Sequence, residues 1–197
     1  MDKSNTPVII LIGLTGAGKS LVARLFEETG RAERVARLTT RKLRGDDDPL
    51  LVLSVSKIEP ADNDFIYHGW NDDMYCIPYS FVFNIIQKQR LPIVELGAFD
   101  DANKLKQMLG YAYIVLIERP FDTASIRRTC SERGMSEDDI LARIESLTED
   151  YLELETNRQK FDYIIDNQYA VEYLQQRVWQ LLDTIAKKPQ PSIFSGE

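Results

Sequence analysis

Short runs of apolar residues alternate along the chain with segments whose apolar positions recur at helical spacing. The first run, Val8–Ile12, is apolar at every position, which is typical of a strand covered on both faces within a parallel sheet. A glycine-rich turn follows. Beyond the turn, apolar residues return at the spacing of one helix face, at Leu21, Val22, Leu25 and Phe26. The pattern predicts a strand, a loop and a helix in succession.

Three later apolar runs predict further buried strands, over residues 91–96, 111–117 and 161–166. Helical periodicity fills the segments around them, at residues 80–89, 100–109, 123–133, 136–157 and 171–186. Strands that alternate with helices predict an α/β fold with a central parallel sheet and right-handed crossovers. Residues 37–79 break this pattern because they are rich in charged, aromatic and turn-forming residues, and we interpret them as an insertion.

Length and hydropathy narrow the class of protein. The 197 residues suit one domain, or one core with small inserted parts. The longest apolar run, Val8–Ile12, is far shorter than the ~20 residues that a helix needs to span a bilayer. The amino terminus also lacks the apolar stretch of a secretory signal. We therefore expect a cytoplasmic protein with no membrane partner.

Charge and reactive residues exclude several kinds of site. The net charge is −7, from 31 acidic and 24 basic residues, which argues against broad binding to nucleic acid. A few arginines in one cleft can still attract a small phosphate ligand. Cys76 and Cys130 are the only cysteines and form no CxxC pair, and His68 is the only histidine. A disulfide framework, a zinc site and a Ser-His-Asp triad are therefore not expected.

The turn after the first run reads GLTGAGKS over residues 13–20, which fits the pattern G-x-x-x-x-G-K-[ST]. Glycines let successive backbone N–H groups face inward, and the N-terminus of the following helix favours negative charge. Lys19 is expected to reach the β- and γ-phosphates of ATP, and the Ser20 hydroxyl to bind Mg²⁺. The residues predicted to contact ATP are Gly13, Thr15, Gly16, Ala17, Gly18, Lys19, Ser20 and Leu21.

The strand predicted over residues 91–96 carries a carboxylate, Glu95, after the apolar pair Ile93 and Val94. In a P-loop fold such a strand lies beside the loop strand, and its carboxylate orients Mg²⁺ or a water bound to it. We therefore predict that Glu95 belongs to the metal shell and lies beside the substrate.

Further segments carry motifs in a fixed order. Residues 39–46 read TTRKLRGD, close to T-T-R-x-x-R-x-G-E, and residues 65–78 form an aromatic segment that ends in YCIP. Residues 131–144 contain SERG and ARI, with Arg133 and Arg143, and residues 161–167 read FDYIIDN. Together with the loop, these segments resemble the guanylate kinase family over residues 8–185.

The resemblance implies a P-loop NTPase three-layer sandwich with a central parallel sheet, an inserted acceptor-binding subdomain and a helical lid. It divides the chain into a core of residues 1–36, 88–130 and 158–186, an acceptor-binding subdomain of residues 37–87, and a lid with its following helix at residues 131–157. The last residues, 187–197, contain two prolines and few apolar positions, and we expect a flexible tail there.

The resemblance also implies roles for single residues. Arg41 and Arg44 would bind the phosphate of the acceptor, while Arg133 and Arg143 would stabilise the transferring phosphoryl group. The implied catalytic set is Lys19, Arg41, Arg133 and Arg143. The implied substrate-binding set is Thr40, Arg41, Arg44, Tyr67, Tyr75 and Glu95. Asn167 occupies the position from which the family contacts the base of the donor.

The acceptor site departs from the family pattern at several positions. Tyr67 replaces the glutamate that reads guanine, Gly97 replaces an acidic residue, and Ile77 replaces a hydroxyl residue. Each unpaired polar group of a buried guanine would cost ~1–3 kcal/mol, so strict GMP specificity is not expected. The Tyr-x-x-Pro ending also resembles the ribose bisphosphate phosphokinases. The three aspartates of residues 46–48 are expected to form a solvated turn.

The sequence thus predicts an ATP- and Mg²⁺-dependent kinase. The acceptor would be a phosphorylated small molecule, a nucleoside monophosphate or a related ester, that receives the phosphoryl group on a phosphate or a hydroxyl. We expect a monomer or homodimer with no nucleic-acid partner. Three alternatives stay open: a guanylate-kinase-like binding module without activity, a regulatory NTPase that hydrolyses ATP, and a sugar phosphate kinase.

Overall fold

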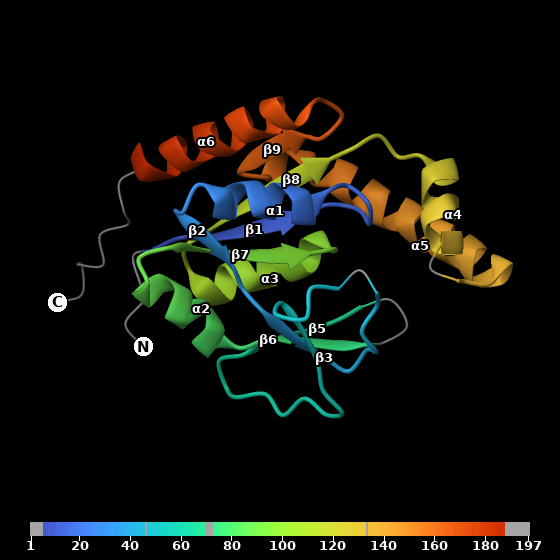
Figure 1. The fold of residues 1–197 in the computed structure, drawn as a ribbon, viewed down its shortest axis with the longest axis horizontal. Helices are drawn as coiled ribbons and strands as arrows, with labels where there is room; N and C mark the ends of the chain where they lie inside the picture. Colours follow the sequence, from blue (N-terminus) through green and yellow to red (C-terminus); the bar gives the residue numbers. More distant parts are fainter. Residues whose placement is uncertain (1–5, 46, 70–72, 133, 188–197) are drawn as a thin grey trace.

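A five-stranded parallel sheet forms the centre of the protein, in the strand order β2-β7-β1-β8-β9 (Figure 1). The structure, a computed structural model, describes residues 6–45, 47–69, 73–132 and 134–187. The strands of this sheet are β1 (Val8–Ile12), β2 (Ala32–Arg34), β7 (Leu91–Leu96), β8 (Ala112–Glu118) and β9 (Tyr163–Asp166). The prediction of an α/β fold with a central parallel sheet is confirmed.

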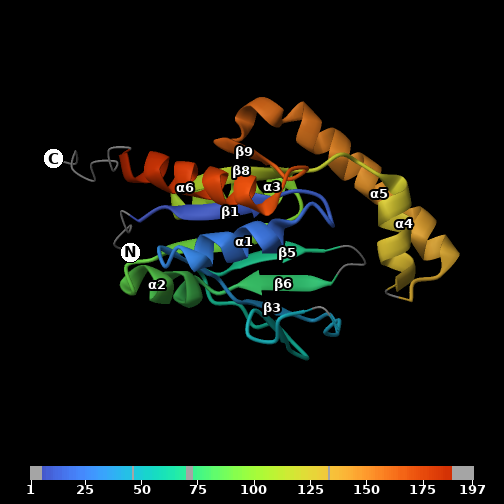
Figure 2. The ribbon, with the colours of Figure 1, turned by 45° about the horizontal axis from the view of Figure 1, so that its top comes forward.

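Helices cover both faces of the sheet, which makes three layers. The helices are α1 (Lys19–Glu28), α2 (Tyr79–Gln87), α3 (Phe99–Leu109), α4 (Thr123–Glu132), α5 (Glu137–Thr156) and α6 (Val171–Lys187), with a 3-10 turn, η2, at Arg158–Lys160. In Figures 1 and 2, α1 and α6 lie on one face and α3 lies on the other. The predicted helices agree with these bounds to within two residues at each end.

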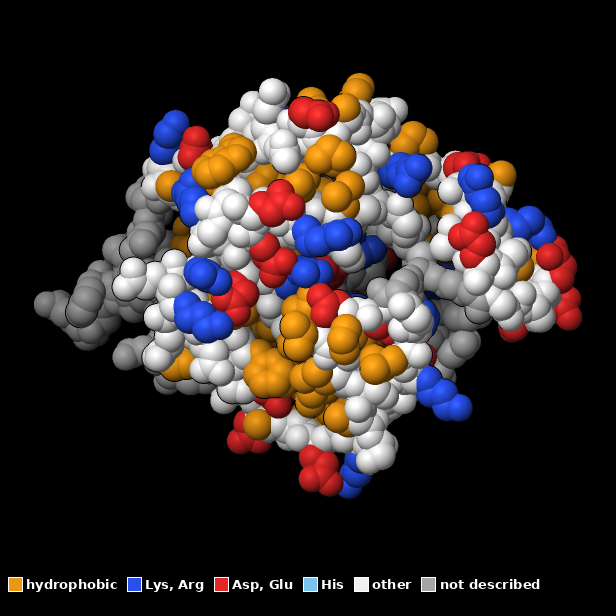
Figure 3. Space-filling view, in the orientation of Figure 1, with side chains coloured by type: hydrophobic (Ala, Val, Ile, Leu, Met, Phe, Trp, Pro, Cys, Tyr) orange, Lys and Arg blue, Asp and Glu red, His pale blue; other side chains and the backbone are white. Residues whose placement is uncertain are grey.

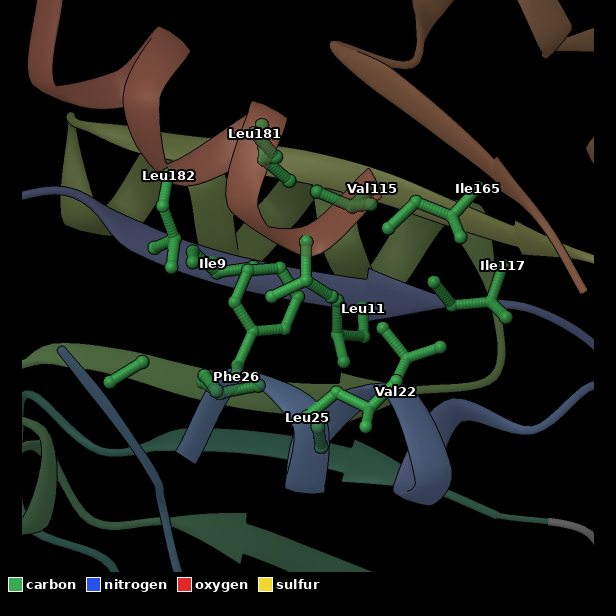
Figure 4. Packing of buried hydrophobic residues seen from close by; sticks show 14 of the residues in the cluster. Ile9, Leu11, Val22, Leu25, Phe26, Val115, Ile117, Ile165, Leu181 and Leu182 are labelled. Carbon is green, nitrogen blue, oxygen red and sulfur yellow. The ribbon is translucent and has the colours of Figure 1, made fainter. Parts of the chain in front are cut away.

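Every position of β1 is apolar because alternate residues of the strand pack into two different clusters of the core. Ile9 and Leu11 pack against α1 and α6, in a cluster that includes Phe26 and Leu181 (Figure 4). Val8, Ile10 and Ile12 point to the opposite face, where they join a second cluster with residues of α2 and α3. Because successive side chains of a strand face opposite ways, both faces of β1 are buried.

A second sheet of four short strands lies below the core in Figure 1. It contains β3 (Arg37–Thr39), β4 (Val52–Ser54), β5 (Phe65–His68) and β6 (Met74–Ile77), in the order β4-β3-β6-β5. Phe65 and Ile77 belong to the second core cluster, so this sheet packs directly on the core. The sheet falls within the segment that the sequence predicted to be an insertion.

Helices α4 and α5 pack against each other at one end of the molecule, beyond the edge of the central sheet (Figures 1 and 2). Ser136 caps the start of α5, since its hydroxyl accepts a hydrogen bond from the Asp139 amide at 3.2 Å. The other end of α5 is fixed to the core, where Leu154 is buried and Glu153 accepts a hydrogen bond from the Asp100 amide at 3.2 Å. The helix therefore extends from the core towards the end of the molecule.

Of the tail expected at residues 187–197, only Lys187 lies among the described residues, and it ends α6. None of the helices in the described part of the chain combines the length and the apolar character that crossing a membrane requires.

Candidate active site

The glycine-rich loop of residues 13–20 joins the end of β1 to the start of α1, as the motif requires. Gly18 precedes α1 with a φ of 92°, in the left-handed region, and a Cβ there would collide with the amide of Asn167. A Cβ on Gly13 would collide with the Ile117 carbonyl of β8. The backbone of β8 therefore excludes a side chain at Gly13, and the positive φ together with the Asn167 side chain favours glycine at position 18.

We expect Gly18→Ala to weaken ATP binding at least tenfold and to destabilise the protein, because a left-handed residue costs roughly 1–2 kcal/mol and the added methyl displaces Asn167. Gly30→Ala is the matched control, since Gly30 also has a positive φ, of 71°, but has open space around it. Titration with Mg-ATP and thermal unfolding of both variants test this. Equal ATP affinity in the two variants would contradict the account.

The side chain of Lys19 lies folded into the loop. Its ammonium group donates hydrogen bonds to the carbonyls of Gly13 at 2.6 Å and Leu14 at 3.0 Å. The pKa of Lys19 is lowered to about 8, chiefly by burial and also by the positive charges of Arg37 and Arg143, against the opposing effect of Glu95. The ammonium is therefore short of anionic partners, and a polyphosphate in the loop would supply them.

This pKa predicts that ATP binding takes up a proton in alkaline solution. Near pH 9 the free protein holds Lys19 mostly neutral, because its pKa is about 8, whereas phosphate oxygens favour the ammonium form. Binding heats measured near pH 9 in two buffers of different ionisation enthalpy should show uptake approaching one proton. Near pH 6.5 this uptake by Lys19 should vanish, and Lys19→Arg should lack it at both pH values. Equal heats in both buffers near pH 9 would refute the prediction.

Ser20 and Glu95 meet at the mouth of the loop, where the Ser20 hydroxyl donates a hydrogen bond to the Glu95 carboxylate at 2.8 Å. The contact follows from topology, because β7 lies beside β1 with Glu95 opposite Leu11. Within the described ranges no cluster of three or more His, Cys, Asp or Glu residues could hold a metal. A hydroxyl and one carboxylate do suit Mg²⁺, which keeps waters and substrate phosphates as its other ligands.

Two predicted residues from distant segments also reach the loop. Arg143 of α5 donates a hydrogen bond to the Thr15 hydroxyl at 2.8 Å. Asn167, directly after β9, donates from its side chain to the Ala17 carbonyl at 2.7 Å. The structure thus brings α5 and the end of β9 onto the loop. Arg133, the other arginine predicted in the lid, lies outside the described residues.

Arg41 lies two residues after the end of β3, and its guanidinium is hydrogen-bonded within the protein. Its guanidinium forms two hydrogen bonds of 2.9 Å with the Asp47 carboxylate and also donates to the Lys42 carbonyl at 2.7 Å and the Tyr75 hydroxyl at 3.0 Å. These contacts use four of its five N–H groups, and the residue is 8% exposed. Arg41 therefore fixes the turn that contains Asp47.

This arrangement corrects one expectation. Residues 46–48 were expected to form a solvated turn, but the Asp47 side chain is only 11% exposed because Arg41 holds it. The guanidinium also keeps the pKa of Asp47 below its usual range, although burial acts in the opposite direction. Asp46 lies outside the described residues.

The other predicted acceptor residues lie on β5 and β6 or in the segment after β3. Tyr67 and Tyr75 stack with ring centroids 5.1 Å apart, and burial raises the pKa of Tyr67 to about 12, so its hydroxyl stays protonated. The Thr40 hydroxyl accepts a hydrogen bond from the Met74 amide at 3.0 Å. The Arg44 side chain is exposed at the surface.

A cavity of about 340 Å³ separates the loop helix from the second sheet. A band of acidic and basic side chains crosses the surface between the core and this sheet (Figure 3). Residues of both parts line the cavity: Ser20, Arg24, Arg34, Val35, Arg37, Gly45, Asp47, Asp48, Leu51, Val52, Ile77, Ile93, Val94 and Glu95. Sequence reasoning missed Arg24, Arg34 and Arg37. A signal existed for Arg24, which lies four residues after Ser20 and hence on the same face of α1.

Comparisons with known proteins bear on the fold. No protein-family model matches the chain, and no curated protein matches it either. A solved guanylate kinase from Anaplasma phagocytophilum superposes with a TM-score of 0.66 at 17% identity, over 96% of this chain and 92% of that one. The chain has a P-loop kinase fold.

A gluconokinase from Sinorhizobium meliloti 1021 gives a TM-score of 0.45 at 14% identity, over 92% of this chain and 96% of that one. At these identities the likeness concerns the fold alone. A function for this chain therefore has to be argued from the chemistry of the residues described above.

Proposed function

We propose that the protein is an ATP-dependent phosphotransferase that transfers the γ-phosphoryl group to a phosphorylated small molecule. One observation carries the proposal: Lys19, the Ser20–Glu95 pair and Arg143 meet at the phosphate-binding loop, at one end of a cavity that arginines line. A donor polyphosphate in the loop and an acceptor in the cavity would therefore lie side by side.

The loop residues would bind the donor. Backbone N–H groups at the start of α1 would hold the phosphates, and Lys19 would exchange its bonds to the Gly13 and Leu14 carbonyls for bonds to phosphate oxygens. Ser20 and Glu95 would hold Mg²⁺, which when bound neutralises charge on the β- and γ-phosphates. Arg143 would contact the γ-phosphoryl group from the lid side, since it already reaches Thr15.

Little further chemistry is required of the protein. A phosphate oxygen of the acceptor is already anionic, so no general base has to remove a proton from it. Alignment of the two substrates and stabilisation of charge in the transition state then account for the rate. Closure of α4 and α5 over the loop would exclude water, which otherwise competes as an acceptor.

The test is an ADP-release assay with Mg-ATP held constant and the acceptor varied over nucleoside monophosphates, sugar phosphates and sugar bisphosphates. We expect ADP release to depend on one class of acceptor. Release at the same rate without any acceptor would instead indicate an NTPase. ATP binding without release in any mixture would indicate a binding module.

A further inference from the structure

Helix α5 is fixed to the core by two side chains that lie on either side of Asp150 in the sequence. Arg143 donates its hydrogen bond to Thr15 in the loop that follows β1, and Glu153 accepts one from the Asp100 amide at the start of α3. Helix α3 follows β7, which is a neighbour of β1 in the parallel sheet. The two contacts therefore hold this part of α5 beside the edge of the sheet at which β1 and β7 end.

Asp150 lies on the face of α5 that is turned towards this edge. It follows Arg143 by seven residues, which is about two turns of a helix. Leu147 and Leu154, three residues before it and four after it, are both buried. The side chain of Asp150 is half-buried in consequence, whereas that of the preceding residue, Glu149, is exposed. Asp150 thus places a carboxylate on the loop side of the helix.

The carboxylate of Asp150 lies in the field of two cations of the donor site, yet it forms no hydrogen bond or ion pair within the described ranges. Burial raises its pKa above the ordinary value, although the positive charges of Arg143 and Lys19 act in the opposite direction. The negative charge of Asp150 in turn raises the pKa of Lys19, as that of Glu95 does. Asp150 therefore brings a negative charge close to the ammonium group of Lys19 without contacting it.

This charge bears on the nucleotide that the loop would bind. Under the proposed function Lys19 binds phosphate oxygens and Arg143 contacts the γ-phosphoryl group, so the γ-phosphate would enter the region that the charge of Asp150 reaches. Like charges repel, and dissolved salt screens this repulsion less in a partly buried site than at an open surface. The repulsion depends on the net charge of the γ-phosphate, which a bound divalent cation lowers. ADP has no γ-phosphate and would largely avoid the repulsion.

We propose that Asp150 makes the donor site selective for metal-bound ATP, because its carboxylate repels a γ-phosphate whose charge no cation neutralises. The inference rests on the proposed function, since it takes the loop of residues 13–20 as the ATP site. Ser20 and Glu95 would hold the Mg²⁺ ion, and Asp150 penalises its absence. Asp150 is thus a specificity-determining residue that disfavours metal-free ATP strongly, and Mg-ATP and ADP only weakly.

The test is calorimetric titration of the natural protein and of Asp150→Asn, with metal-free ATP in excess EDTA, Mg-ATP and metal-free ADP as the three titrants. We expect the substitution to lower the dissociation constant of metal-free ATP about tenfold, as removal of one like charge at close range in a partly shielded site would. The dissociation constants of Mg-ATP and ADP should fall by no more than about threefold, because less negative charge then faces position 150. Detectable binding of metal-free ATP by the variant alone would be the same result in a stronger form.

Two further variants isolate the charge at this position. Glu149→Gln removes the same charge from the neighbouring residue, whose side chain is exposed, and should leave all three dissociation constants unchanged. Asp150→Glu keeps the charge and should retain the selectivity for Mg-ATP over metal-free ATP. Asp150→Asn should fold, since the amide has nearly the shape of the carboxylate and no ion pair among the described residues is lost. Thermal unfolding of each variant checks this.

The outcomes separate the inference from the proposed function. If Asp150→Asn binds all three titrants as the natural protein does, gains as much affinity for ADP as for metal-free ATP, or binds ATP more weakly, the inference is wrong and the kinase proposal stands. If the natural protein binds neither ATP nor Mg-ATP at millimolar concentration, the kinase proposal is wrong and the inference fails with it.

Discussion

Replacement of Lys19 by alanine will lower the rate of phosphoryl transfer roughly a hundredfold to a thousandfold, the loss expected when one preorganised donor is removed from a transition state. The fold should survive, because among the described residues the ammonium group donates hydrogen bonds only to two carbonyls of its own loop. Removal of a half-buried cation whose pKa is already lowered should cost little stability.

The measurement is acceptor-dependent ADP release, with thermal unfolding as the check on the fold. Lys104→Ala is the control, since that side chain is 67% exposed on α3 and lies 3.8 Å from Asp101. Full activity in a folded Lys19→Ala variant would show that the loop takes no part in phosphoryl transfer.

Replacement of Arg143 by alanine will reduce kcat about a thousandfold, in the range found for arginines that contact a transferring phosphoryl group, while ATP affinity changes far less. The reason is geometric. Arg143 reaches the loop from α5 through a 2.8 Å hydrogen bond to the Thr15 hydroxyl. We therefore expect it to contact the γ-phosphoryl group of bound ATP and to add little to the binding of the α- and β-phosphates. Rates under saturating substrates and a separate ATP titration distinguish the two effects.

Arg143→Lys should recover only a small part of the rate, because an ammonium cannot form the paired bonds of a guanidinium. Arg31→Ala should behave as the natural protein, since Arg31 lies against α6. If Arg143→Ala weakens ATP binding and kcat equally, Arg143 serves donor binding and does not act selectively in the transition state.

Local signals explain which parts of the fold the sequence could predict. Val8–Ile12 is apolar at every position because helices cover both faces of β1, and the phosphate-binding loop is a contiguous motif. The edge strand β2 gave no such signal, since its Ala-Glu-Arg sequence is short and only Ala32 is fully buried. Its pairing with β7 depends on tertiary contacts that no local pattern reports.

The sequence also gave no signal that three arginines would line one cavity, because they come from three different elements. Arg24 belongs to α1, Arg34 to β2 and Arg37 to β3, and only the packing of the second sheet against the core brings them to one cavity. The pairing of Arg41 with Asp47 could not be predicted either. A run of aspartates predicts a solvated turn, and the sequence does not show that a buried arginine lies beside it. Motifs therefore predicted the residues that gather at the loop, whereas the arginines of the cavity could be found only from the structure.

Calorimetric titration of the protein with Mg-ATP tests the central claim most directly. We predict one saturable site, with an affinity between about micromolar and millimolar as is usual for enzyme substrates, that Lys19→Ala weakens and Lys104→Ala leaves unchanged. Absence of binding at millimolar Mg-ATP, or binding that Lys19→Ala leaves intact, would contradict the assignment of the loop as the donor site.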